Sequence, residues 1–436
     1  MLSYIKPYLL EYFLSDKMLN KRRIKAEKIR IRMNEPHNMI VYLSISDPNS
    51  YLLIQVLPEF LARFKVQVTY KTILHKQNAM FPEPDRWDAN IFNDSKRMAE
   101  LYDLRGPVKA PSKEYLCEYI SLLLASNEQD SDFLEKAKSL FDIYWTGSDS
   151  LVNAYIKGLS IKDPSAQLAR LTQNERDLSD NKHYLSGNIY YEGEWYWGLE
   201  RLQYLERRLN TQGLSDKNRI IYDKLHQHLI PYDSKQVKKN PQNKTLTIYF
   251  SLRSPYSYLG IQRASQLAKH YGIQFEIKPV LPMMMRNLKV PKTKGTYIAL
   301  DTKRESKRYG IPFGKLADPL GKGVERCYAL FEYAKSQGKQ ELFLLNYARC
   351  VWSEGVLSET DRGLKHIVEI SGLDWDQAKP LLKKDDWREW ADNNLNELYS
   401  LGLWGVPSFS YEGSSVFGQD KLYFIERTIR KDLFQS

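Results

Sequence analysis

At 436 residues the chain is too long for one ordinary hydrophobic core, and a typical domain length of about 150 residues predicts two or three domains. Apolar residues make up 42% and charged residues 27% of the sequence, proportions that argue against disorder for most of the chain. The formal net charge of +11 raises nucleic acid or an anionic surface as a partner, so the position of the charge matters.

Much of the positive charge lies at the N-terminus. The first 35 residues hold nine Lys or Arg against four Asp or Glu, and apolar residues alternate with charged ones where a signal peptide would have an apolar run. No apolar stretch of about 18 residues follows. We expect a basic helical arm that packs against or tethers a domain, with nucleic acid or lipid less favoured as partners. No membrane span is expected, and the cytoplasm is the default location.

Two parts of the sequence resemble each other. Residues 41–55 align without a gap with residues 248–262, and eight of the fifteen positions are identical, where unrelated sequences would give about one. The similarity returns near the ends of both parts, at residues 198–202 and 418–422. This pattern predicts a tandem duplication. The predicted boundaries are residues 1–36 for the arm, 37–212 for the first domain, 213–243 for a polar linker and 244–436 for the second domain.

Both copies show the same order of elements. β-rich runs are expected at residues 39–45 and 66–74 of the first copy and at 246–252 and 273–281 of the second. A proline after the first run of each pair can open a helix, so each copy begins as a βαβ unit with parallel strands. In the second copy, helical patterning is expected over residues 316–337, 339–354, 361–371 and 375–383, followed by a hairpin around Glu412 and a last helix from Asp420. The fold class predicted is α/β, with two thioredoxin-like domains that are each interrupted by an all-helical insert.

A possible reactive position lies where the first strand of the second copy meets its helix. Ser254 comes directly before Pro255, which places its hydroxyl beside the unpaired N–H groups and the positive end of the helix dipole. An anion such as a thiolate is favoured there, and Ser254 can donate one hydrogen bond to it. Thioredoxin-like oxidoreductases carry Cys-x-x-Cys at this junction, whereas this chain has Ser-Pro-Tyr-Ser, so the sulfur must come from a ligand. Ser254 as a plain helix N-cap is the alternative.

Three separated motifs carry a resemblance to a known family: residues 249–257, Gly405-Val-Pro-Ser-Phe409 and Phe417-Gly-Gln-Asp-Lys-Leu422. Over residues 244–431 the chain resembles the kappa-class glutathione transferases and the 2-hydroxychromene-2-carboxylate isomerases, in the DsbA-like branch of the thioredoxin superfamily. The resemblance implies glutathione as the thiol cosubstrate. It also implies a transferase or isomerase that acts on a small electrophilic molecule.

The resemblance further implies a role for several residues. Ser254 would donate to the thiolate, and Val406 with Pro407 would form a cis-proline loop whose backbone pairs with the cysteinyl unit of glutathione. Gln419 and Asp420 would bind the γ-glutamyl end, and Asn287 would also touch the ligand. Supporting residues at the junction are Pro255, Tyr256 and Arg253. Arg253 departs from the family's apolar residue and would add positive charge next to the thiolate.

The first copy lacks the same set of residues. Asp47 stands in place of Ser254, Gly187 in place of Pro407 and Glu200 in place of Asp420. A carboxylate at the helix end would repel a thiolate, so we expect this copy to be a scaffold, a regulatory surface or the partner in an internal pseudo-dimer.

Other chemistry has little support in the sequence. The three cysteines, Cys117, Cys327 and Cys350, are far apart, and neither H-E-x-x-H nor a Cys/His ligand spacing occurs, so no metal is expected. Trp404 and the Met283–Met285 triplet can line a substrate pocket or simply pack in the core. The alternatives to a transferase or isomerase are a thiol-disulfide or peroxide reductase that uses glutathione, and a non-catalytic binding protein.

Overall fold

The computed structural model describes residues 2–109, 113–227 and 244–434, and the chain divides into two compact units. The N-terminal unit is Asn20–Gln227, and the C-terminal unit joins Met1–Leu19 to His228–Ser436. The predicted arm consists of two helices, α1 (Leu2–Phe13) and α2 (Asp16–Arg32). Among the described residues, no helix is both long enough and apolar enough to cross a membrane.

The predicted linker is described only up to residue 227, and residues 228–243 lie outside the described residues. Tyr222 is buried, its backbone N–H donates to Glu206 Oε2 at 2.9 Å, and helix α10 (Lys224–Gln227) follows. The first part of the predicted linker therefore packs onto the N-terminal unit, because a buried tyrosine anchors a segment whose composition is otherwise polar.

The two units contain four-stranded sheets of the same design. In the N-terminal unit the order is β2-β1-β3-β4, with β1 parallel to β2 and antiparallel to β3, and β3 antiparallel to β4. The C-terminal sheet has the order β6-β5-β7-β8 with the same directions. The strands are β1 (Asn38–Leu43), β2 (Gln67–Thr72), β3 (Asn188–Tyr191), β4 (Glu194–Trp197), β5 (Thr245–Phe250), β6 (Gln274–Pro279), β7 (Ser408–Tyr411) and β8 (Ser414–Phe417).

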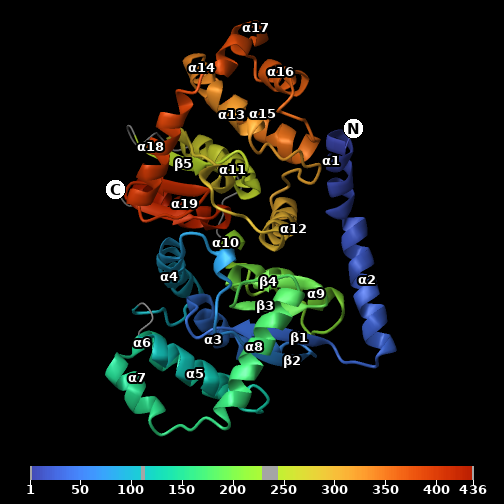
Figure 1. The fold of residues 1–436 in the computed structure, drawn as a ribbon, viewed down its shortest axis with the longest axis vertical. Helices are drawn as coiled ribbons and strands as arrows, with labels where there is room; N and C mark the ends of the chain where they lie inside the picture. The colour runs from blue at the N-terminus through green and yellow to red at the C-terminus, as the bar shows by residue number, and fades with distance from the viewer. Residues whose placement is uncertain (1, 110–112, 228–243, 435–436) are drawn as a thin grey trace. The chain divides into compact units, whose positions relative to one another are not determined.

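Helices join and cover the strands of each unit (Figure 1). The N-terminal unit contains α3 (Pro48–Ala62), η1 (Asn78–Met80), α4 (Pro84–Tyr102), α5 (Glu114–Asn127), α6 (Phe133–Thr146), α7 (Asp149–Ile156), α8 (Pro164–Asp180), η2 (Leu199–Arg201) and α9 (Leu202–Thr211). The C-terminal unit contains α11 (Pro255–Tyr271), η3 (Met283–Arg286), α12 (Lys292–Arg308), α13 (Lys322–Ala329), α14 (Phe331–Ser336), α15 (Gln340–Arg349), η4 (Cys350–Glu354), α16 (Asp361–Ile370), α17 (Trp375–Ala378), η5 (Lys379–Lys383), α18 (Trp387–Ser400), η6 (Gln419–Lys421) and α19 (Leu422–Phe434). The described residues between the second and third strand of each sheet form helices and loops, which confirms the predicted thioredoxin-like α/β fold class.

The local sequence explains how α11 is placed. Pro255 occupies its first turn, Ser254 caps its N-terminus, and Gly272 at φ +65° ends it in the left-handed conformation that glycine tolerates. The single helix predicted over residues 316–337 is instead two short helices, α13 and α14, and the first begins only at Lys322. Pro319 lies before that start, and a proline disfavours helix at the residue preceding it.

The helical insert of the C-terminal unit is anchored close to the strand ends. Trp352 Nε1 donates to the Leu252 carbonyl at 2.9 Å, and the Tyr328 hydroxyl donates to the Val280 carbonyl at 2.7 Å. Each of these two carbonyls lies just beyond a strand, so insert side chains satisfy backbone groups that the sheet leaves unpaired. In Figure 1, α14, α16 and α17 form the end of the insert farthest from the sheet of this unit.

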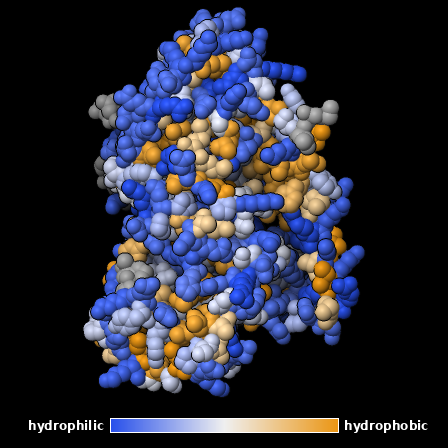
Figure 2. All heavy atoms as spheres, viewed as in Figure 1, coloured by the Kyte–Doolittle hydropathy of each residue, from blue (hydrophilic) through white to orange (hydrophobic). Residues whose placement is uncertain are grey.

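Helix α1 leaves several large apolar side chains exposed. Tyr8 is 60% and Leu9 62% exposed, and Figure 2 shows hydrophobic residues over this helix. Pro7 of the same helix is buried beside Gly355, and Lys315 Nζ is 3.9 Å from the centre of the Tyr8 ring. The first helix of the arm therefore packs on the C-terminal unit.

Candidate functional site

Ser254 lies at the junction of β5 and α11, as predicted. Its backbone is extended, with φ −92° and ψ 114°, and its Oγ accepts a hydrogen bond from the Ser257 N–H at 3.1 Å. The same hydroxyl donates to the Val406 carbonyl at 3.3 Å. Ser254 is thus an N-cap and also the point at which α11 meets the loop before β7. Its donated hydrogen bond is long, and the side chain is only half-buried.

The loop opposite Ser254 contains a cis peptide bond between Val406 and Pro407. Pro407 is buried against α11, where a Cβ added to Gly260 would lie 3.0 Å from both Cβ and Cγ of the proline. Glycine at position 260 therefore lets the loop approach the helix. In the N-terminal unit the corresponding helix position is Leu53, which is fully buried, and the loop has Gly187 at φ +62° in place of proline.

Helix α12 connects the three motif segments. Asp301 Oδ2 accepts from the Tyr256 hydroxyl at 2.7 Å, at the start of α11. Glu305 Oε2 accepts from Gln419 Nε2 at 2.6 Å, in the motif before α19. Lys294 Nζ lies 5.3 Å from the centre of the Trp404 ring, in the segment that leads to the cis peptide. A spacing of seven and then four residues keeps these three side chains on one face of the helix.

Lys294 lies close to the predicted site residues, and the sequence analysis did not single it out. Its side chain is only 6% exposed, and burial lowers the pKa of its ammonium group from 10.5 to about 8. Buried lysines with a lowered pKa occur often at functional sites, which makes Lys294 a candidate site residue. The helical spacing that it shares with Asp301 and Glu305 is visible in the sequence, but the sequence does not say which face of α12 meets the motifs.

Gln419 and Asp420 open the last helix, at η6. The Gln419 side chain is buried, and its Oε1 accepts from Arg263 Nη1 at 2.6 Å while its Nε2 donates to Glu305. Its amide is therefore held inside the protein, and its backbone carbonyl also accepts from Arg263. Asp420 is half-buried, and its carboxylate folds back beside Gly418, which has φ +104°.

The remaining predicted residues are less closely assembled. Asn287 is exposed and ends η3 in the left-handed conformation, with φ +62°. Arg253 forms a two-fold ion pair with Asp318, with Nε–Oδ1 and Nη2–Oδ2 distances of 3.0 Å each. Its charge is therefore largely offset by a carboxylate before any ligand binds. Pro255 is half-buried at the first turn of α11.

The N-terminal unit places Asp47 where the other unit has Ser254. Asp47 caps α3, and its carboxylate accepts from the Asn49 N–H and from the hydroxyls of Ser50 and Ser186. Burial raises the pKa of this carboxyl, and the three hydrogen bonds act in the opposite direction. A hollow in this unit is lined by Asp47 and by aromatic residues that include Trp87. Glu200, at the place of Asp420, is buried.

The C-terminal half of the chain is similar to a known protein family. Residues 245–430 match the family model described as the DSBA-like thioredoxin domain. The C-terminal half carries a DsbA-like thioredoxin domain. All three motifs, Ser254, the cis-proline loop and Gln419–Asp420 lie within it.

Curated relatives that match this DsbA-like domain include two proteins named 2-hydroxychromene-2-carboxylate isomerase. The protein from Pseudomonas putida is 25% identical over 186 residues, which are 41% of this chain and 90% of the relative. The protein from Sphingobium xenophagum is 26% identical over 195 residues, 42% of this chain and 96% of the relative. A solved structure of such an isomerase covers 44% of this chain and 99% of its own, at 24% identity and a TM-score of 0.39. The cytosolic disulfide reductase DsbM from Pseudomonas aeruginosa covers 43% of this chain and 98% of its own, at 17% identity and a TM-score of 0.34.

Proposed function

We propose that the DsbA-like domain is a glutathione-dependent transferase or isomerase that acts on a small electrophilic substrate. The observation that carries this proposal is the Ser254 hydroxyl, which caps α11 and lies 3.3 Å from the Val406 carbonyl of the cis-proline loop. Relatives named as isomerases support an enzymatic role for this half of the chain.

The side chains and backbone of the site suit a thiol tripeptide. The Val406 backbone lies beside the N-terminus of α11, and the buried Lys294 ammonium stands next to the same loop. In this proposal Val406 pairs with the cysteinyl unit, Lys294 attracts a carboxylate, and Asp420 attracts the γ-glutamyl ammonium group. Asn287 contributes only if its exposed side chain turns towards the ligand.

When bound, glutathione supplies the nucleophilic thiolate. The Ser254 hydroxyl then donates to the sulfur instead of to the Val406 carbonyl. The N–H groups in the first turn of α11 stabilise the negative charge of the thiolate, because they form the positive end of the helix dipole. No cysteine of this unit stands at the junction, since Cys327 lies on α13 and Cys350 on η4. A disulfide reductase activity would therefore also need the sulfur of glutathione.

We further propose that the chain arose by tandem duplication and that its first copy has lost the site. The equal strand orders support this, as does a repeated contact in which a serine hydroxyl receives a backbone N–H, Ser50 from Ser44 and Ser257 from Ser251. Asp47 and Gly187 leave the first copy without the proton donor and the proline. A role as a regulatory surface or as an internal pseudo-dimer partner is proposed for it.

Calorimetric titration with reduced glutathione tests the proposal. Ser254→Ala is expected to weaken binding by roughly tenfold or more, because a hydrogen bond to a charged sulfur is worth about 1.5–3 kcal/mol. Ser148→Ala is the matched control, since Ser148 caps α7 in the N-terminal unit by accepting from the Leu151 N–H at 3.3 Å. It loses the same kind of cap and should bind normally.

A substrate panel then separates the activities. Consumption of conjugated electrophiles, lost in Ser254→Ala, supports a transferase or isomerase, and reduction of disulfides or peroxides alone would identify the reductase instead. Wild-type protein that does not bind glutathione at millimolar concentration would contradict the proposal and favour a non-catalytic binding protein.

A further inference from the structure

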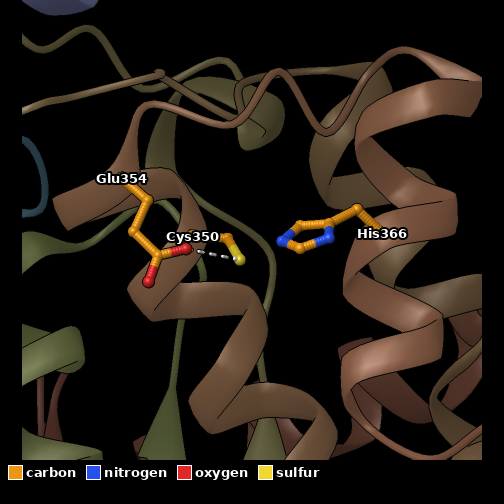
Figure 3. Close-up of side chains that lie close together, drawn as sticks. All are labelled: Cys350, Glu354 and His366. Carbon is orange, nitrogen blue, oxygen red and sulfur yellow. Dashed lines mark hydrogen bonds between the residues drawn. The ribbon is translucent and has the colours of Figure 1, made fainter.

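We propose that Cys350, Glu354 and His366 form a zinc-binding site in the helical insert of the C-terminal unit. The Cys350 sulfur, a Glu354 carboxylate oxygen and a His366 ring nitrogen all lie within 4.8 Å of one another. Figure 3 shows the sulfur between the other two groups, with the imidazole ring of His366 pointing towards it from α16. This site is separate from the Ser254 junction and does not depend on the proposed function.

The three side chains come from two elements. Cys350 and Glu354 lie at the two ends of η4, a single π-helical turn that continues α15, and His366 lies on α16. π-helical turns inside helices occur often at functional sites because they redirect side chains. Here the turn brings a residue pair four apart to one side of the helix, opposite a histidine from a neighbouring helix.

The chemistry of the set favours zinc. Thiolate, imidazole and carboxylate are the three ligand types that zinc takes in proteins, and thiolate disfavours calcium or magnesium. Three protein ligands leave a fourth tetrahedral position for water or for an added ligand. The separations found are wider than those around a bound ion, and the exposed Glu354 and His366 side chains have the freedom to close them.

The ligand atoms are largely available for an ion. Within the described part of the chain, His366 makes no hydrogen bond or ion pair. Glu354 Oε1 is 3.3 Å from Arg349 Nε, and its other oxygen, Oε2, accepts a weak hydrogen bond from the Cys350 thiol at 3.3 Å. An ion would replace only that thiol proton, while Arg349 would continue to orient the carboxylate.

A reactive cysteine is a less suitable interpretation of the same residues. Cys350 is fully buried, whereas reactive thiols are at least partly exposed. A second acidic cluster with histidine, Glu27, His37 and Glu192, offers a contrast. There Arg30 donates to Glu27 at 2.6 Å and Arg208 donates to Glu192 at 2.8 Å, so that cluster is an ion-pair network already.

Binding at this site would act on the DsbA-like domain through one side chain. Trp352 lies in the same π-helical turn as Cys350, and its indole holds the Leu252 carbonyl, two residues before Ser254. An ion that joins η4 to α16 would brace this turn and raise the melting temperature by mass action.

The test uses Co²⁺ as a spectroscopic probe on the full chain, stripped with a chelator and kept reduced. We expect one ion per chain with an ultraviolet sulfur-to-cobalt charge-transfer band, displaced by Zn²⁺. Cys350→Ser should abolish the band. Glu354→Gln and His366→Ala should each weaken Co²⁺ binding by at least about tenfold, because even the loss of a residue that only hydrogen-bonds to a metal ligand lowers metal affinity by about tenfold or more.

Two variants serve as controls. Cys117→Ser removes a thiol from the N-terminal unit, and His75→Ala removes an exposed histidine that also lies beside a carboxylate, Glu175. Both should keep the band. His366→Ala changes an exposed side chain and leaves folding intact, so it decides the matter if Cys350→Ser does not fold. Absence of the band in wild type, or full binding by His366→Ala, overturns the proposal.

Discussion

Replacing Lys294 with methionine is expected to weaken glutathione binding by about tenfold or more while making the protein more stable near neutral pH. The ammonium group is buried, and burial lowers its pKa from 10.5 to about 8. A lysine whose pKa is lower in the folded chain than in the unfolded chain reduces the free energy of unfolding. This penalty is complete below about pH 8, where both forms carry the proton. The penalty disappears as the pH rises from about 8 to 10.5, because the folded chain has then already lost the proton.

Chemical denaturation and calorimetry measure both effects. At pH 7 we expect Lys294→Met to gain about 1–3 kcal/mol in unfolding free energy, and this gain should shrink near pH 10. The exposed Lys289 provides the control, since Lys289→Met removes the same charge and should change neither quantity. A variant that is less stable at neutral pH and binds glutathione normally would show that Lys294 is only a packing residue.

Replacing Arg263 with methionine is expected to cost about 3 kcal/mol of unfolding free energy. Arg263 is 3% exposed, donates from Nη1 to the backbone carbonyl and to Oε1 of Gln419, and lies 3.7 Å from the centre of the Tyr309 ring. Without Arg263, the backbone and side-chain oxygens of Gln419 lose this hydrogen-bond donor where they are buried, next to the fully buried Glu305. Glutathione binding should fall as well, because Gln419 holds η6.

Arg388→Met is the matched control for that loss. Arg388 lies 4.4 Å from the centre of the Trp387 ring, but its side chain is 53% exposed and its ion pair with Glu325 is 3.6 Å long. We expect a change within about 0.5 kcal/mol for it, measured by urea unfolding. Equal effects of the two substitutions would mean that the Arg263 network contributes no more than a surface contact.

The sequence predicts the fold well because its signals are local. Short β-rich runs and a proline after the first run describe β5, the start of α11 and β6 to within a few residues. The long insert is harder, since a break such as that between α13 and α14 leaves the apolar pattern almost unchanged. The burial of Tyr222 in the predicted linker depends on contacts with residues far away in the chain.

The sequence predicts the site residues that belong to a motif, but not those that only tertiary contacts bring to the site. Ser254, Val406 and Pro407 stand out by motif, and the structure brings them together. Lys294 carries no motif, and only its burial beside Trp404 distinguishes it from other lysines. The engagement of the Gln419 amide by Arg263 is likewise invisible in the sequence, because the two residues are 156 apart.

The proposed metal ligands show the same limit. Cys350 and Glu354 are four residues apart, but the third proposed ligand, His366, follows twelve residues later on another helix. The common ligand spacings of zinc sites do not match this set. Short metal-binding motifs do not include this arrangement, so the sequence alone predicts no metal here. A π-helical turn, which rearranges the residues of a helix locally, has no clear sequence signal.

The pH dependence of thiolate absorbance in the ultraviolet tests the central claim, that the Ser254 end of α11 ionises bound glutathione. We expect the thiol of glutathione bound to the wild type to have a pKa at least about one unit below that of free glutathione. In Ser254→Ala, at saturating ligand, the value should return towards that of free glutathione, and Ser148→Ala should behave as wild type. An equal pKa for bound and free glutathione, or a lowered one that Ser254→Ala leaves unchanged, would contradict the account.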